Sequence, residues 1–289
     1  MVVSARSARP DAATLRARAR IARDNLRACT LCEFRCGVDR TRPVGELART
    51  PCGLGAESRT FKRHISFAEE LELLPSYMVY LGGCNFRCRF CVQGPTCFSP
   101  SAGDLVNSVE LARECEAIVA RGARTINLLG GEPSLHLHTV LELAAEAELP
   151  IAFNSNMYMT EEALELLDGV VAIYVADLKF GNDRCAEEVA RAPRYLEVVR
   201  RNLLRAAGQA PLIVRHLLMP GHLECCLRPS AEWVAEHLPQ ATFNVMSSYV
   251  PAWQAARDAG PLGGLLSRAE IHAAEELVRA LGLRREAMS

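Results

Sequence analysis

Six short apolar runs, separated by longer stretches of helical periodicity, dominate the chain after residue 76. The runs are 77–81, 125–129, 150–153, 170–178, 212–218 and 242–246, and their lengths suit single buried strands. Apolar residues three or four positions apart predict helices over 109–120, 135–148, 161–167, 192–207, 231–238 and 268–281. Right-handed crossovers between such units give a parallel sheet with the helices outside. We therefore predict an α/β fold, a partial (β/α)6 barrel of parallel strands.

The chain has 12 cysteines, most of which form two groups. The groups consist of Cys29, Cys32, Cys36 and Cys52 and of Cys84, Cys88 and Cys91. No apolar stretch approaches the roughly 18 residues of a membrane span, and the N-terminus lacks the apolar core of a secretory signal. We therefore expect a cytoplasmic chain whose cysteines serve metal or redox chemistry. The formal net charge of −1 favours neither nucleic acid nor a membrane surface as a partner.

The second cysteine group directly follows the first predicted strand, with the spacing C-x3-C-x2-C. Three thiolates at Cys84, Cys88 and Cys91 can hold three irons of a 4Fe–4S cluster and leave the fourth iron without a protein ligand. A structural zinc site is the alternative, with Cys97 as the nearest fourth ligand. The residues between the cysteines are too polar for a buried strand, which disfavours simple core packing.

This motif, with Phe90 before the last cysteine, resembles the cluster motif of the radical S-adenosylmethionine (SAM) enzymes. The resemblance implies that Cys84, Cys88 and Cys91 are catalytic, because in such enzymes the open iron binds the amino and carboxylate groups of SAM. The reduced cluster then cleaves SAM to methionine and a 5′-deoxyadenosyl radical, which abstracts hydrogen. Cys97 would then be available as a thiyl or proton donor at the mouth of the site.

The second predicted strand ends in Gly130, Gly131 and Glu132, followed by Pro133. This sequence resembles the superfamily's Gly-Gly-Glu-Pro motif, whose backbone and glutamate contact the methionine amino group. Two glycines permit the close backbone approach that such a contact needs. The alternative is an ordinary turn in which Pro133 starts a helix.

Polar residues also end the later strands. Asn154 follows the third strand, where glycyl-radical activating enzymes commonly carry an aspartate, and Asp177 and Lys179 end the fourth. By resemblance these residues would bind the ribose and the methionine carboxylate; a surface ion pair between Asp177 and Lys179 is the alternative. Arg215 and Asn244, at the ends of the last two strands, are further candidates.

The order of these motifs over about 29–281 resembles the pyruvate formate-lyase activating enzyme-like branch of the superfamily. That resemblance implies a partner enzyme whose glycine loses hydrogen, and an electron donor such as flavodoxin or ferredoxin. The residues after Cys91, Val92-Gln93-Gly94-Pro95, depart from the branch pattern, so a peptide or small-molecule substrate stays open. A non-catalytic metal-binding interaction protein is the hypothesis from another class.

The first cysteine group has the spacing C-x2-C-x3-C-x15-C. Four thiolates at Cys29, Cys32, Cys36 and Cys52 suit a zinc ion or a second Fe–S cluster, and we favour the cluster because an electron must reach the first one. Segment 29–75 shows no sustained periodicity, so we predict loops stapled by the metal. Residues 1–75 would form a helical lead-in and this cysteine-rich metal-binding segment, and 76–289 the barrel.

Several other polar residues lie near these motifs. His64 and the pair Glu69 and Glu70 are similar to a stretch in the activating-enzyme-like relatives, although an exposed helix start explains them equally well. His136 and His138 follow the Gly-Gly-Glu-Pro turn, where they would contact substrate or face solvent.

Overall fold

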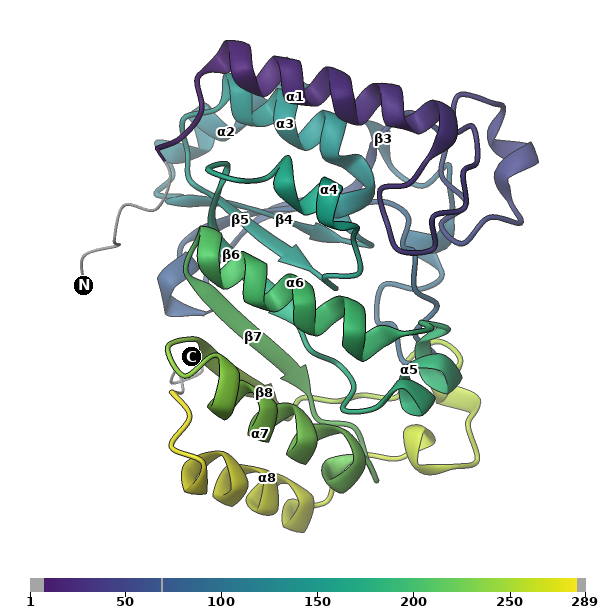
Figure 1. Ribbon diagram of the computed structural model, residues 1–289, viewed down its shortest axis with the longest axis vertical. Helices are drawn as coiled ribbons and strands as arrows, with labels where there is room; N and C mark the ends of the chain where they lie inside the picture. Colours follow the sequence, from purple (N-terminus) through teal and green to yellow (C-terminus); the bar gives the residue numbers. More distant parts are fainter. Residues whose placement is uncertain (1–7, 69, 285–289) are drawn as a thin grey trace.

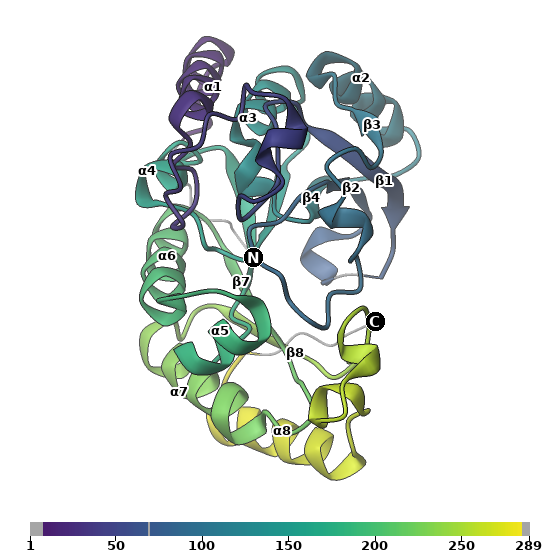
Figure 2. The same ribbon diagram turned by 90° about the vertical axis from the view of Figure 1, so that its right-hand side faces the viewer.

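The computed structural model describes residues 8–68 and 70–284. Its strands form one sheet in the order β3-β1-β2-β4-β5-β6-β7-β8, which curves through the centre of the molecule (Figures 1 and 2). The strands are β1 Arg59–Ser66, β2 Ser76–Leu81, β3 Asp104–Leu105, β4 Thr125–Gly130, β5 Ile151–Ser155, β6 Val171–Asp177, β7 Leu212–Leu217 and β8 Thr242–Met246. Every pairing from β2 to β8 is parallel, which confirms the six-stranded partial barrel.

Helices cover the outside of this sheet (Figure 1). They are α1 Ala12–Asn25, α2 Ser108–Val119, α3 Leu137–Glu146, α4 Glu161–Glu165, α5 Asp183–Ala190, α6 Tyr195–Gln209, α7 Arg228–His237 and α8 Arg268–Ala280. The helix predicted over 192–207 is α6, but α5 was not predicted. Arg191 and Arg194, on either side of Pro193, adopt left-handed backbone conformations and separate the two helices.

The prediction of loops throughout 29–75 is wrong for β1. This strand pairs antiparallel with β2, and β3 pairs antiparallel with β1. Only Thr60 in β1 is buried, so its sequence lacks the alternation of apolar and polar residues that identifies a strand.

The predicted lead-in helix is α1, although residues 1–7 lie outside the described part of the chain. Asp11 caps the helix by accepting from the Thr14 backbone, and the buried side chains of Leu15, Ala19 and Ala22 lie on its inner face. Figure 1 shows α1 lying along α3. The N-terminal segment thus packs directly on the barrel.

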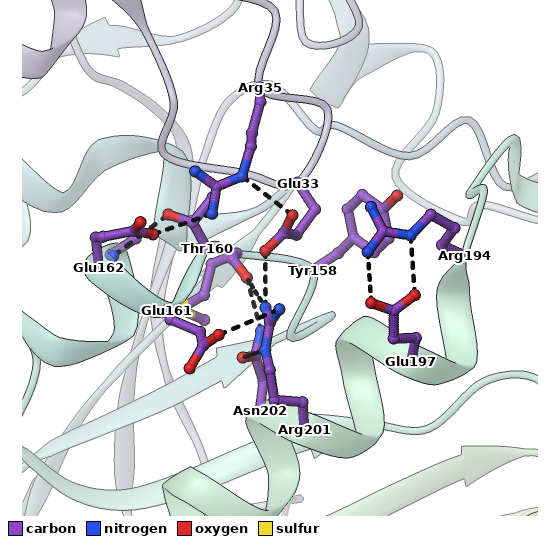
Figure 3. A network of polar contacts seen from close by, with 12 residues as sticks. Glu33, Arg35, Tyr158, Thr160, Glu161, Glu162, Arg194, Glu197, Arg201 and Asn202 are labelled. Carbon is purple, nitrogen blue, oxygen red and sulfur yellow. Dashed lines mark hydrogen bonds and ion pairs between the residues drawn. The ribbon is translucent and has the colours of Figure 1, made fainter.

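A polar network anchors the first cysteine group to the barrel (Figure 3). The buried Glu33 carboxylate accepts from Arg201 of α6 at 2.8 Å. The neighbouring Asn202 amide donates to the carbonyls of Met157 and Met159, each at 2.7 Å. The segment therefore has a fixed position relative to the end of β5.

The N-terminal end of the barrel is filled by the short turn Leu71–Leu73. Leu73 packs with Ala152, Val175 and Ile213 inside the sheet, so the lower interior is apolar and closed. Within residues 8–68 and 70–284, no helix combines the length and apolar character needed to cross a bilayer.

Candidate active site

Cys84, Cys88 and Cys91 all lie in the loop that follows β2, at the C-terminal edge of the parallel sheet. Cys88 is buried, and the other two thiols are half-buried. Backbone amides in this loop bond to the end of α5, Arg87 to Ala190 at 3.0 Å and Arg89 to Val189 at 2.9 Å. The loop is therefore held in place by protein contacts of its own.

The glycines at the end of β4 pack against this cysteine loop. The amides of Gly131 and Glu132 donate to the carbonyls of Leu81 and Gly83, each at 2.8 Å. A Cβ on Gly131 would lie 1.8 Å from the Gly83 oxygen, and one on Gly130 would lie 2.5 Å from Leu81. The close approach that requires these glycines is thus to the neighbouring loop, beside Cys84.

Glu132 is fully buried and already has several partners. Its carboxylate accepts from the Ser134 amide at 3.0 Å, the Ser155 hydroxyl at 2.7 Å and the Asn156 amide at 2.8 Å. Burial nevertheless raises its pKa. The side chain connects the ends of β4 and β5.

Asn156, two residues after the predicted Asn154, lies next to the cysteine loop. Its amide donates to the Asn85 oxygen at 2.8 Å and points toward the Cys84 sulfur, 3.9 Å away. Asn154 is half-buried on β5, paired in register with Val175. Asn85 and Asn156 are residues that sequence reasoning passed over, because neither stands at a motif position.

Asp177 and Lys179 form an ion pair at the end of β6. Their side chains are only 23% and 19% exposed, so the pair is largely shielded from solvent. Burial lowers the pKa of Lys179, but the carboxylate of Asp177 outweighs this effect and raises it overall. Tyr195, also not predicted, accepts from the Lys179 backbone amide at 2.7 Å.

The Lys179 ammonium lies near enough to the cysteine loop for its charge to act on Cys88. Burial raises the pKa of Cys88 to about 12, while the charge of Lys179 acts in the opposite direction. Because Cys88 follows β2 and Lys179 follows β6, this electrostatic effect indicates that the two loops approach each other at the same edge of the sheet.

Arg215 on β7 is paired in register with Asp177 on β6 and with Asn244 on β8. The three residues therefore lie at the same level of the barrel. Arg215 and Asn244 both contact the buried Glu70, whose carboxylate accepts from Arg215 Nε at 2.6 Å and from Asn244 at 2.8 Å. Burial raises the pKa of Glu70, but Arg215 and Asn244 overcome this effect and lower it. Glu69, its predicted companion, lies outside the described residues.

Three further candidates lie away from solvent. Cys97 is buried and hydrogen-bonds to Cys91, which lowers the pKa of Cys91 to about 6. His136 is fully buried between the Gly82 carbonyl, at 2.7 Å, and the Ser58 hydroxyl, at 2.9 Å. His138 is also buried, so neither histidine faces solvent, and His136 braces the start of the cysteine loop.

The first cysteine group lies next to the loop that carries the second one. The Cys32 thiol lies near Asn85, which directly follows Cys84 in the chain. The Arg40 guanidinium is completely buried, 3.9 Å from the Cys29 sulfur. A buried positive charge beside a thiol of this group suits a site that becomes anionic when its thiols ionise.

The donor set of the second group fits a 4Fe–4S cluster. In the described part of the chain, its three sulfurs are not gathered within 4.8 Å of one another, as the ligands of a single ion would be. Burial raises the pKa of Cys84 and Cys88, and a bound metal would favour their thiolate forms. Three thiols for four irons also leave an open coordination position.

Comparison with known proteins agrees with this geometry. The family model of the Radical SAM superfamily matches residues 78–234, and the chain belongs to this superfamily. Its cofactors are accordingly a 4Fe–4S cluster and SAM. A protein of Methanocaldococcus jannaschii described as uncharacterized protein MJ0674 is 31% identical over 277 residues, 91% of this chain and 78% of that protein.

Other relatives match a smaller part. The GTP 3′,8-cyclase of Rhizobium meliloti is 35% identical over 103 residues, which cover 32% of this chain and 29% of the cyclase. Among solved structures, Streptococcus suis SuiB bound to the precursor peptide SuiA aligns with a TM-score of 0.54 at 14% identity, over 71% of this chain and 46% of SuiB. At that identity the likeness shows the fold alone.

Proposed function

We propose that this chain cleaves SAM reductively and uses the resulting radical to remove hydrogen from a glycine of a partner polypeptide. The observation that carries the proposal is the convergence of the cysteine loop, the Gly-Gly turn and the Asp177–Lys179 pair at one edge of the sheet. When bound, the reduced cluster supplies the electron that splits SAM into methionine and a 5′-deoxyadenosyl radical. The residues of the chain position the reactant for this step.

Each group at this edge has a role in that positioning. Cys84, Cys88 and Cys91 hold the cluster, and the backbone around Gly130 and Gly131 receives the methionine amino group. Lys179, kept protonated by Asp177, offers a positive charge to the methionine carboxylate or a donor to the ribose. Arg215 is bound to Glu70 and contributes by holding the neighbouring strands in register.

A polypeptide substrate is supported by the exposed apolar side chains around the site. Val92, directly after Cys91, is 65% exposed, and Val250, in the loop after β8, is 52% exposed. Apolar side chains at the rim of a site favour contact with another protein. The structural neighbour SuiB was solved with a precursor peptide, whereas the cyclase relative supports a small-molecule substrate as the second candidate.

We further propose that the first cysteine group holds a second Fe–S cluster, which passes electrons from a donor such as flavodoxin or ferredoxin. Among the described residues, no three of Cys29, Cys32, Cys36 and Cys52 have sulfurs within 4.8 Å of one another. Four thiolates suit a closed cluster as well as one zinc ion, and we favour the cluster because an electron must reach the active site. The contact of Cys32 with Asn85 provides a short path between the two sites.

The test is anaerobic reconstitution with iron and sulfide, followed by SAM and dithionite and an assay of 5′-deoxyadenosine. Wild type should release the nucleoside, while Cys88→Ala should lose at least about 99% of the activity because one iron loses its ligand. Cys115→Ala, a buried cysteine of α2 outside both groups, is the matched control. Release by Cys88→Ala at the wild-type rate would overturn the cluster assignment.

Two readouts separate the remaining alternatives. An iron content of about eight atoms per chain supports a second cluster, and a content of about four contradicts it. Incubation with a glycyl-radical enzyme such as pyruvate formate-lyase should produce the doublet of a glycyl radical in its electron paramagnetic resonance spectrum. Release of 5′-deoxyadenosine without that doublet on any glycyl-radical enzyme would favour the small-molecule substrate.

A further inference from the structure

Three cysteines and a histidine converge at a place that belongs to neither cysteine group. Cys185 lies in the first turn of α5, and His222, Cys225 and Cys226 lie in the turn before α7. Their ligand atoms all lie within 4.8 Å of one another. In residues 8–68 and 70–284, no other set of three or more potential metal ligands is gathered this closely.

The distances match the edges of a tetrahedron around one zinc ion. Zn–S and Zn–N bonds of about 2.3 and 2.05 Å place sulfur atoms about 3.8 Å apart and a sulfur about 3.6 Å from a nitrogen. The Cys225 sulfur lies 3.8 Å from that of Cys226 and 3.9 Å from that of Cys185. The Nδ1 atom of His222 lies 3.4 Å from Cys225 and 3.6 Å from Cys226.

Local structure explains how neighbouring cysteines face one point. Residues Leu223–Leu227 form a π-helical turn, in which the amides of Cys226 and Leu227 both donate to the His222 carbonyl. Residues three and four positions after a helical residue lie on its face, so His222 shares a face with Cys225 and Cys226. Such turns often occur at functional sites.

Supporting contacts bring Cys185 to the same point. The Asn182 amide donates to the Cys225 carbonyl at 2.7 Å and to the Cys185 sulfur at 3.2 Å. Its side-chain oxygen accepts from the Cys185 backbone at 2.8 Å. A Cβ on Gly181 would lie 2.5 Å from the Cys226 carbonyl oxygen, so a glycine permits this approach. Hydrogen bonds to ligand sulfurs are typical of the outer shell of metal sites.

The types of ligand atom indicate which metal the site would bind. Three thiolates and one imidazole, all from protein, form a closed Cys3His set, which is typical of structural zinc. Calcium and magnesium require oxygen ligands. A 4Fe–4S cluster would spread the sulfurs over separate irons, and a disulfide needs an S–S distance of about 2.05 Å, far below the 3.9 Å between Cys185 and Cys225.

We propose that Cys185, His222, Cys225 and Cys226 bind one structural Zn²⁺. The ion cross-links the first turn of α5, which follows the loop that contains Lys179, to the β7–α7 connection. All four ligand positions are filled by side chains, so the site takes no substrate. Its role is to fix two loops at the edge where the active-site residues converge, independently of which molecule the enzyme modifies.

The test is metal analysis of the full chain, produced in zinc-supplemented medium, purified anaerobically and reconstituted with iron. Relative to wild type, Cys185→Ser/Cys226→Ser should lose about one zinc per chain while its iron content stays unchanged. Cys115→Ser is the control and should keep all its zinc. X-ray absorption at the zinc edge of wild type should show sulfur at about 2.3 Å and nitrogen at about 2.0–2.1 Å.

A second variant distinguishes loss of the zinc site from misfolding of the chain. His222→Cys keeps four soft ligands, so it should retain the zinc with an all-sulfur spectrum. The proposal is overturned if wild type contains no zinc, if the double variant retains all of it, or if anaerobically purified protein contains a Cys185–Cys225 disulfide. Loss of iron instead of zinc from the double variant would overturn the choice of metal.

Discussion

Polar side chains around the active site are each held by partners within the protein. Glu132 joins the ends of β4 and β5, Lys179 pairs with Asp177, and His136 braces the Gly82 carbonyl. Side chains held in this way have little conformational freedom left to lose when a ligand binds. The cysteine loop is therefore organised by the protein itself.

The buried histidines make the stability of the fold depend on pH. Burial lowers the pKa of His136 and of His138 to about 3, whereas an unfolded histidine has a pKa of about 6.5. Between these values the unfolded chain binds more protons, so stability falls as the pH drops below about 6.5 and continues to fall until about 3. At pH 5.5 each histidine lowers the free energy of unfolding by about 1.4 kcal/mol.

Urea unfolding at pH 7.5 and 5.5 measures this effect. His136→Gln keeps a donor for Gly82 but does not titrate. Between the two pH values, its free energy of unfolding should therefore fall by about 1.4 kcal/mol less than that of wild type. His272→Gln, on the exposed face of α8, is the control. Equal pH dependence in wild type and His136→Gln would contradict the prediction.

At the scale of elements, the sheet and the site are joined by backbone contacts between adjacent strand ends. Gly130 and Gly131 of the β4 end lie against the loop after β2, with hydrogen bonds at 2.8 Å from Gly131 and Glu132. The cysteine loop and the Gly-Gly turn therefore move as one unit.

A substitution at Gly131 tests this contact. In Gly131→Ala the new Cβ would lie 1.8 Å from the Gly83 oxygen, so the loops must separate. We expect a loss of about 1–3 kcal/mol in the free energy of unfolding and at least about a tenfold fall in 5′-deoxyadenosine release, since about 1.4 kcal/mol of lost positioning is tenfold. Gly208→Ala in α6, with no atom within 4 Å of the new Cβ, should be neutral or slightly stabilising. Equal free energies of unfolding and equal 5′-deoxyadenosine release in both variants would contradict this prediction.

Sequence predicted most of these elements because strand and helix periodicities were regular after residue 76. It missed α5, β1 and β3, because α5 and β3 are short and β1 is mainly exposed or half-buried. The group formed by Cys185 and Cys225 was also not recognised. Their 40-residue separation carries no spacing signal, and only the parallel order of β6 and β7 brings them together.

At the scale of the whole molecule, one ion pair links the beginning of the barrel to its last strands. Glu70 precedes β2, yet its carboxylate is bound by Arg215 of β7 and Asn244 of β8. The six-stranded sheet does not close through its own hydrogen bonds. This buried contact connects its two sides instead.

Removing Arg215 leaves an unpaired buried carboxylate. Arg215→Met should therefore lower the free energy of unfolding by about 3–5 kcal/mol, as measured by denaturant titration. Adding Glu70→Gln should restore part of the loss, because the neutral amide still offers an oxygen to Asn244. A loss below about 1 kcal/mol in the single variant would show that the pair does not hold the barrel together.

The arginines of the N-terminal segment determine where a shortened chain can begin. Arg9 donates to the carbonyls of Ala144 and Ala147 at the end of α3, and Arg18 donates to those of Leu166 and Asp168 after α4. A truncated protein that starts at the predicted boundary, residue 76, would leave these carbonyls without their donors and expose the apolar surface beneath α1. A shortened gene made for crystallisation or for directed evolution should therefore begin no later than Ala8, and an affinity tag belongs before that position.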